Sequence, residues 1–421
     1  MKVSTALPVV AALAAVSVVY AAPLQRRAGV GNKKKMAETT SFDSSGAVYF
    51  LTNEPDVNQI LVASINVDGT LNLDSAVEAG GRGSHGKSNG PDALFSQGSI
   101  KASKKGQVLA TVNAGSNTIS LFSIDPKDPT SLTPLGDPVS SEGEFPVSLA
   151  FNADGTRLCV LNGGTVSGVN CFKVDKKLGP VAIANSLRLL TATDALKGAQ
   201  TPPAGPTNTA SQVLFSEDGQ QLIASVKGTP QAPGFFAIWS VAADGSLSKD
   251  FQKVAPAKGG ALPFGMSVIP GKKALLATDP ALGFDILDLD GGNKRSSANK
   301  IAGQAAICWS AFSPKTGNFY LSDVGMSTIT EVHVDNNLNV TVVMEYPQLP
   351  GSATLDLDVA TINGRDFVYV LAANATSVDV LAIDSPGAAT KLTALNFASL
   401  AKTAGVTINP NNLQGMTTFT T

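Results

Sequence analysis

The chain has 421 residues, of which 43% are hydrophobic and 15% are charged, and its formal net charge at pH 7 is −2. This charge excludes the strongly basic surface through which proteins bind nucleic acid, and no apolar stretch after the first 22 residues approaches the ~20 residues of a membrane-spanning helix. The 40 Gly and 24 Pro residues suit many turns, and the hydrophobic content predicts a large core that needs no metal or disulfide framework.

The first 27 residues have the pattern of an export and processing segment. Residues 1–22 combine one Lys, an apolar run and an ending in small residues, as secretory signal peptides do. Arg26 and Arg27 follow as a dibasic pair, where we expect a protease to trim the secreted precursor. We therefore predict a protein that is secreted, extracellular or held in a cell wall. Its predicted parts are a signal peptide at 1–22, a propeptide at 23–27, an N-terminal tail at 28–46 and one domain at 47–421.

Most of the remaining chain repeats one unit of short apolar runs and tight turns. Residues 145–175 show the unit as FPVSLAFNADGTRLCVLNGGTVSGVNCFKVD, in which Asp-Gly and Gly-Gly separate three alternating runs, as in antiparallel strands joined by turns. The unit occurs seven times, and its second run recurs every 45 to 64 residues. Such periods with several strands per repeat are typical of β-propellers. We therefore predict an all-β, seven-bladed propeller of four-stranded antiparallel blades.

The first unit lacks the inner run that precedes the turn in the other six. Residues 412–419, NLQGMTTF, resemble residues 262–269, LPFGMSVI, which contain the inner run of the fifth unit. We therefore predict that the C-terminal segment supplies the inner strand of the first blade. Closing the ring in this way leaves no sheet edge exposed. The alternative inner strand is residues 39–42, which also precede a turn.

The three Cys residues allow one disulfide. Cys159 and Cys171 are equidistant from Thr165, the middle of a loop between two strands, so they would face each other across a hairpin. We expect a disulfide between them, and two buried free thiols are the alternative. Cys308 lies in an inner run and is expected to be an inert core thiol.

Two Asn-X-Thr sequons begin at Asn339 and Asn374, with no Pro in the middle position. Asn374 follows a second run and would lie on a loop, whereas Asn339 lies in or beside an outer strand. In a secreted chain both are expected glycan acceptors.

Residues 80–92, GGRGSHGKSNGPD, form a Gly-rich loop before the inner run of the second unit. Arg82 and Lys87 could bind a carboxylate there, and His85 has the residue type that exchanges protons near neutral pH. These three are the candidate catalytic residues. The alternative is a flexible surface loop with scattered charges.

Polar residues recur where each second run ends, and a propeller brings these positions to one face of the ring. With polar residues of the inner runs, they would surround a water-filled funnel that binds a small polar or carboxylated ligand, or a glycan. Three of the carboxylates could also hold a hard cation, but we predict that they cap strands, and we expect no metal or other cofactor. The candidate ligand-binding residues are Asn53, Asn113, Asn162, Lys227, Asp279, Asp323, Asn374, Gln97, Gln212, Asp356 and Gln414.

Several segments resemble one group of secreted fungal proteins. They include GPDALFSQGSIKAS, GEFPVSLAFNADG, ALPFGMSVIPG, CWSAFSPKTGNFYLSD and NLQGM. In these segments the chain resembles the 3-carboxymuconate cyclase-like proteins. These are similar in turn to the seven-bladed lactonase propellers, which include 6-phosphogluconolactonase and the 3-carboxy-cis,cis-muconate lactonising enzyme. The resemblance implies a lactonase or cycloisomerase that acts without metal on lactones or carboxylated muconates.

The resemblance does not transfer a catalytic set. The lactonising enzymes are thought to use a His and several Arg residues at the mouth of the ring. After residue 27 this chain has only two His and five Arg, and the positions where an inner-strand His would stand carry other residues. The alternative is a non-catalytic extracellular or cell-wall glycoprotein, similar to an antigen or adhesin, that binds glycans, host matrix or small acids. In either case we expect a monomer.

Overall fold

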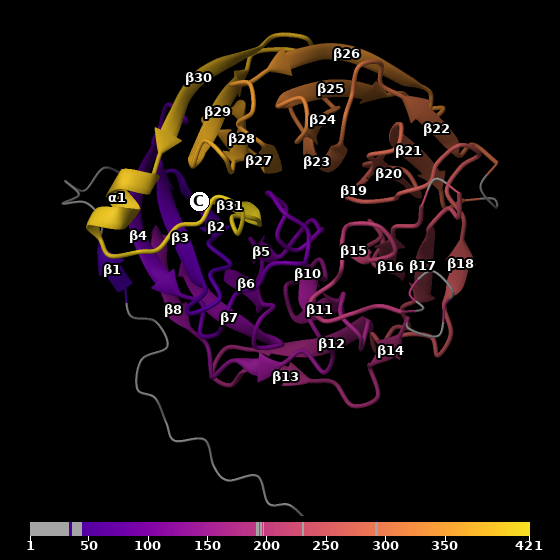
Figure 1. The fold of residues 1–421 in the computed structure, drawn as a ribbon, viewed down its shortest axis with the longest axis horizontal. Coiled ribbons are helices and arrows are strands. Elements are labelled where there is room, and N and C mark those ends of the chain that lie inside the picture. Colours follow the sequence, from indigo (N-terminus) through magenta and orange to yellow (C-terminus); the bar gives the residue numbers. More distant parts are fainter. Residues whose placement is uncertain are drawn as a thin grey trace, which may run out of the picture.

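The computed structural model describes residues 33–35, 44–190, 193, 196, 198–229, 231–290 and 294–421. The predicted signal peptide, the dibasic pair Arg26 and Arg27, and the alternative inner strand at 39–42 lie outside these residues. Within them, seven antiparallel sheets stand around a common axis (Figure 1). The prediction of an all-β propeller with seven blades is confirmed. The only α-helix in the described residues is α1 (Ala398–Thr403), and none there is long and apolar enough to cross a membrane.

Each blade runs from an inner strand at the axis to an outer strand at the rim. The inner strands are β31 (Met416–Thr420), β5 (Ile100–Ser103), β10 (Pro146–Phe151), β15 (Ala210–Phe215), β19 (Met266–Val268), β23 (Ile307–Ser313) and β27 (Thr354–Ile362). The second strands are β2 (Gly46–Leu51), β6 (Val108–Asn113), β11 (Arg157–Asn162), β16 (Gln221–Val226), β20 (Ala274–Asp279), β24 (Asn318–Asp323) and β28 (Arg365–Ala372).

The third strands are β3 (Gln59–Ile65), β7 (Thr118–Asp125), β12 (Gly168–Asp175), β17 (Phe235–Ser240), β21 (Gly283–Asp288), β25 (Thr328–Val334) and β29 (Ser377–Ile383). The outer strands are β4 (Leu71–Glu78), β8 (Asp128–Pro134), β13 (Gly179–Ala182), β18 (Gln252–Val254), β22 (Ser297–Lys300), β26 (Val340–Pro347) and β30 (Ala389–Asn396). Three blades gain a short extra strand: β1 (Lys33–Lys35) beside β4, β9 (Val139–Ser140) beside β7 and β14 (Arg188–Leu189) beside β12. The strand β1 therefore lies at the outer edge of the first blade.

Burial along the strands follows their distance from the rim. Every residue of β2, β6, β20 and β24 is buried, because a second strand packs against the neighbouring blade on each face. The outer strand β26 is mostly exposed, with Val342 and Met344 each 45% accessible. The hydrophobic core therefore lies between the blades, mainly in their inner three strands, and the outer strand β4 adds Leu71, Leu73 and Ala76 to it.

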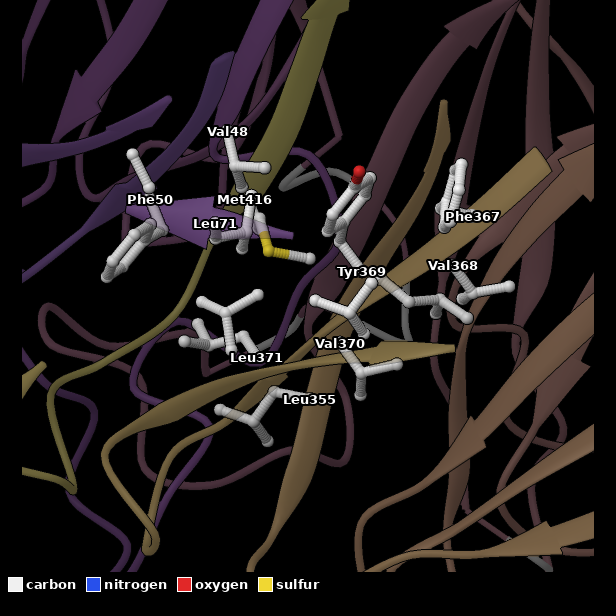
Figure 2. Close-up of a cluster of buried hydrophobic side chains, with 14 of the residues drawn as sticks. Val48, Phe50, Leu71, Leu355, Phe367, Val368, Tyr369, Val370, Leu371 and Met416 are labelled. Carbon is white, nitrogen blue, oxygen red and sulfur yellow. The ribbon is translucent and has the colours of Figure 1, made fainter. Parts of the chain in front are cut away.

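The strand β31 closes the ring, as predicted. It pairs antiparallel with β2, so that Thr418 stands opposite Val48 and Met416 opposite Phe50. Figure 2 shows Met416 and Val48 in one buried cluster with Leu371 of the last blade. On the other side, the Asp358 carboxylate of β27 accepts the Thr418 backbone N–H at 2.8 Å. The first and last blades are thus joined through β31.

A disulfide links neighbouring strands of the third blade. Cys159 on β11 is directly opposite Cys171 on β12, and their sulfur atoms are bonded. Both side chains are buried, and Cys308 is a buried free thiol.

Replacing both Cys159 and Cys171 by Ala should lower the free energy of unfolding by about 3 kcal/mol at most, because the disulfide closes a loop of only 12 residues in the unfolded chain. Urea unfolding of the double variant, with the reduced wild type beside it, measures the difference. A loss well above that limit would show that the two side chains stabilise the blade mainly by packing.

Candidate functional site

At one end of the ring, a cavity of about 330 Å³ is lined mainly by the loops that enter the inner strands, together with residues that follow three of the second strands. Its wall is mostly apolar and is formed by loops of several blades. The residues of its lining that matter for the chemistry are Asp92, Phe95, Lys227, Phe264, Cys308 and Val324.

The floor of this cavity is a segment of the second blade that fills the middle of the ring. Residues 93–98, called here the plug segment, precede the inner strand of this blade, because β5 begins only at Ile100. Asp92 and Phe95 adopt left-handed backbone angles, with φ of 76° and 54°, so the chain turns toward the axis instead of extending. Gly86 packs so closely under Phe95 that a Cβ atom there would overlap the ring.

Three glutamines predicted to line a water-filled funnel are instead used inside the ring. Gln97 donates to the Ser310 carbonyl at 2.7 Å, and Gln414 donates to the Ser96 carbonyl at 2.6 Å. Gln212 joins the fourth and fifth blades by donating to the Met266 carbonyl at 3.1 Å. These amides hold the plug segment and the inner strands together, because a buried polar group needs a partner.

Each second strand ends in, or is followed by, a polar residue, and all but one of these seven residues make the same kind of hydrogen bond. Six of them hydrogen-bond to the loop that enters their own blade, which makes them structural caps. The pairs are Asn53 with Asn412, Asn113 with Ala79, Asn162 with Ser141, Asp279 with Ala261, Asp323 with Ala305 and Asn374 with Gly351. Lys227 is the exception, because its amine reaches the plug segment at the axis.

Lys227 lies directly after β16 and is 1% accessible. Its Nζ donates to the Phe95 carbonyl at 2.5 Å and stands 4.4 Å from the centroid of the Phe264 ring. Burial lowers the pKa of Lys227, and the attraction of the nearby Asp92 carboxylate opposes that shift.

Asp92 supplies the acidic group of the same cavity. Its Oδ1 atom is buried without a hydrogen-bond partner. Burial raises the pKa of Asp92, whereas the charge of Lys227 and the side chain of Gln414 act in the opposite direction. Burial also raises the pKa of the Cys308 thiol well above its ordinary value, so this cysteine stays protonated.

The cavity therefore combines a base and an acid, since burial favours the uncharged form of both side chains. A neutral Lys227 amine can accept a proton, and a protonated Asp92 carboxyl can donate one. Because the wall of the cavity is mostly apolar, both groups have a stronger electrostatic effect on a bound molecule there than in bulk water.

The three candidate catalytic residues of the Gly-rich loop do not line this cavity. Arg82 is exposed, and the Lys87 amine donates to Gln200 at 2.6 Å on the surface. Both ring nitrogens of His85 face carbonyl oxygens of their own loop, those of Gly86 at 2.5 Å and Gly90 at 2.8 Å. The residues of this loop that line the cavity are Ser88, Asn89, Pro91 and Asp92.

Two further carboxyl groups are buried but do not line the cavity. Asp356 on β27 accepts the Gly415 N–H at 2.8 Å, and burial raises its pKa to about 7. Asp285 on β21 is fully buried and has no N–H or hydroxyl donor. Burial raises the pKa of Asp285 to about 8, and the adjacent Asp279 carboxylate adds to the shift by repulsion and by accepting its proton in a hydrogen bond.

The sequon residues Asn339 and Asn374 are both exposed. Asn339 follows a turn that Asp335 stabilises, and Asn374 lies on the loop after β28. No group of three or more His, Cys, Asp or Glu side chains in the described part of the chain is placed to hold a metal ion.

The comparisons with known proteins concern the fold and the first three blades. The sequence model of a family described as lactonase, 7-bladed beta-propeller, matches residues 39–186. No curated protein has a matching sequence.

Several solved structures share the fold at low sequence identity. A proposed 6-phosphogluconolactonase from Bacteroides fragilis is 16% identical, with a TM-score of 0.59 over 90% of this chain and 99% of that one. The periplasmic gluconolactonase PpgL of Pseudomonas aeruginosa is 18% identical, with a TM-score of 0.60 over 83% of this chain and 96% of that one. A functionally unknown protein from Desulfotomaculum acetoxidans is 10% identical, with a TM-score of 0.57 over 88% of this chain and 99% of that one.

Proposed function

We propose that this protein is a lactonase-like enzyme whose reaction takes place in the cavity above the plug segment. The observation that carries the proposal is that Lys227 and Asp92, a base and an acid whose pKa values are shifted toward each other, share one apolar cavity. The match of residues 39–186 to the lactonase propellers supports the same reaction class. So do the names of the Bacteroides and Pseudomonas structures.

Hydrolysis of a lactone requires one group that removes a proton from water and another that donates a proton to the ring oxygen. Lys227 would take a proton from the water that attacks the ring carbonyl, and Asp92 would protonate the ring oxygen as the C–O bond breaks. A cycloisomerase that acts on muconates runs a different reaction, in which a carboxylate oxygen of the substrate adds to a C=C bond. In that reaction Asp92 would supply the proton for the carbon next to the new C–O bond.

The cavity also restricts the substrate. Lys227 is the only Lys, Arg or His among the lining residues of the cavity, and most of the wall is apolar. A small lactone, or its open acid with one carboxylate, therefore fits better than a sugar phosphate. 3-Carboxymuconate carries three carboxylates, and apart from Lys227 the lining offers no Lys, Arg or His to pair with them, although it remains the substrate that the resemblance suggests.

Turnover of a panel of small lactones and 3-carboxymuconate tests the proposal. Lys227→Met and Asp92→Asn should each lower kcat/KM by roughly 100-fold or more, which is the usual contribution of a general acid or base. His85→Ala is the matched control and should stay close to wild type, since His85 bonds within its own loop. Full activity in both cavity variants would overturn the proposed site.

The second candidate function is a secreted or wall-associated glycoprotein that binds a ligand without turnover. Its support is the exposure of both sequon residues, Asn339 and Asn374, since an acceptor Asn must be accessible. It predicts export directed by residues 1–22, glycans on the mature chain, and a folded protein that binds glycans or small acids but converts none of the panel. Mass spectrometry of the secreted chain and a glycan array test it.

A further inference from the structure

The Lys227 amine has fewer hydrogen-bond partners than a charged lysine normally finds. An ammonium group has three N–H donors, but the hydrogen bond to the Phe95 carbonyl is the only one that Nζ makes among the described residues. The Phe264 ring lies beside it, and Asp92 Oδ1, the nearby carboxyl atom, has no partner of its own. A neutral amine fits this environment, because it can donate to Phe95 and keep its lone pair free.

We propose that Lys227 forms a covalent imine with small, mainly apolar aldehydes or ketones that enter the cavity. A buried lysine amine in an apolar pocket is a good nucleophile toward carbonyl carbon, because burial favours its unprotonated form. The cavity of about 330 Å³, walled by groups such as Phe95, Phe264, Leu262 and Val324, suits an aromatic or short aliphatic carbonyl compound. This activity goes beyond lactone opening and needs no lactone turnover.

The step balances within the cavity. The Lys227 nitrogen forms a bond to the carbonyl carbon, and the carbonyl π electrons move to the oxygen, which takes a proton from Asp92. The nitrogen returns a proton to the Asp92 carboxylate, which leaves a neutral carbinolamine. The hydroxyl group then takes a proton from Asp92 and leaves as water, the nitrogen lone pair forms the C=N bond, and the second nitrogen proton returns to Asp92. No oxidant or reductant is needed, and one water is released for each imine.

Exposed lysines provide the internal comparison. Lys87 lies on the neighbouring loop with its amine on the surface. Burial lowers the pKa of Lys227, so a larger fraction of its amine is neutral. Each unit of that shift raises the neutral fraction about tenfold. Lys227 should therefore react at least roughly tenfold faster than the exposed lysines at about pH 7.

The test is reductive trapping. The full chain is incubated with benzaldehyde and sodium cyanoborohydride at about pH 7, and the adducts are located by peptide mass spectrometry. One adduct per chain on the Lys227 peptide is expected, with no adduct at that site in Lys227→Met and full labelling in Lys87→Met. Ala306→Phe, which fills the cavity and keeps Lys227, should block the labelling.

Labelling spread over exposed lysines, or an unlabelled Lys227 in chains shown to be folded by circular dichroism, would overturn the proposal. So would undiminished labelling in Ala306→Phe. If Lys227 is labelled but the protein hydrolyses no lactone, the proposed lactonase function is wrong and the imine proposal stands. If lactone turnover depends on Lys227 but Lys227 is not labelled, the imine proposal is wrong and the lactonase function stands.

Discussion

At about pH 8, Asp285→Asn should raise the free energy of unfolding by several kcal/mol, up to ~5 kcal/mol. Asp285 is fully buried, its oxygens have no N–H or hydroxyl donor, and it lies beside the Asp279 carboxylate. The folded chain therefore holds this carboxyl in its protonated form, whereas the unfolded chain ionises it. An Asn amide is uncharged at every pH and can donate a hydrogen bond to Asp279 as the protonated acid does.

The direction in which stability changes with pH follows from the folded and unfolded pKa values of Asp285. The folded value is about 8 and the ordinary value is 3.8, so between these pH values the folded chain binds one more proton than the unfolded chain. Stability contributed by this group is complete below about pH 4 and is lost as the pH rises to about 8, by about 1.4 kcal/mol per pH unit. The variant should therefore resemble wild type near pH 4 and exceed it increasingly toward pH 8.

Urea unfolding at several pH values between about 4 and 8 measures this difference. Asp288→Asn is the matched control, because Asp288 is a buried residue of the same strand whose carboxylate pairs with Arg295 at 3.2 Å. Loss of that charge should destabilise the chain, so the same substitution has opposite effects at two positions of β21. A difference between Asp285→Asn and wild type that does not change with pH would contradict the protonated carboxyl.

A chain that ends at Gly415 should lose more than about 5 kcal/mol of stability, because it lacks the strand that closes the ring. Met416 and Phe419 are buried side chains of the seam, at 3% and 4% accessibility, and β2 would lose the partner of its inner edge. The Asp358 carboxylate would lose the Thr418 N–H and hydroxyl that it accepts.

Thermal and urea unfolding of this truncated chain test the expectation, with removal of Thr421 alone as the control. Thr421 follows β31 and is exposed, so its loss should change stability by at most about 0.5 kcal/mol. A synthetic peptide of residues 412–421 added to the truncated chain should restore part of the loss. An unchanged unfolding midpoint in the truncated chain would show that β31 contributes little to closure.

The ring could be predicted from sequence because each blade repeats the same order of apolar runs and turns, and burial of both strand faces requires this pattern. The closing strand was identifiable for a similar reason, since the buried Met416 and Phe419 occupy the positions of Met266 and Ile269 in another blade. In both cases the signal is local and is repeated elsewhere in the chain.

The site was only partly predictable. Lys227 could be predicted as a site residue, because it is the one basic side chain among the amides and carboxylates at the ends of the second strands. Asp92 could not, since its place in the cavity depends on the left-handed turns at Asp92 and Phe95, which bring the plug segment to the axis. The same turns explain why Gln97 and Gln414 bond inside the ring, and why the polar funnel predicted from them is filled by the chain itself.

The pairing of β2 with β31 has a consequence for the order in which the protein is made. The strand β2 leaves the ribosome long before its inner neighbour β31, because the other six blades lie between them in the sequence. At about 5 to 20 residues per second, the edge of β2 waits roughly 20 to 75 seconds for its partner. During that time a growing chain carries an apolar strand edge able to pair with other chains. Chaperone binding to nascent chains should therefore persist until β31 has emerged, however early the middle blades fold.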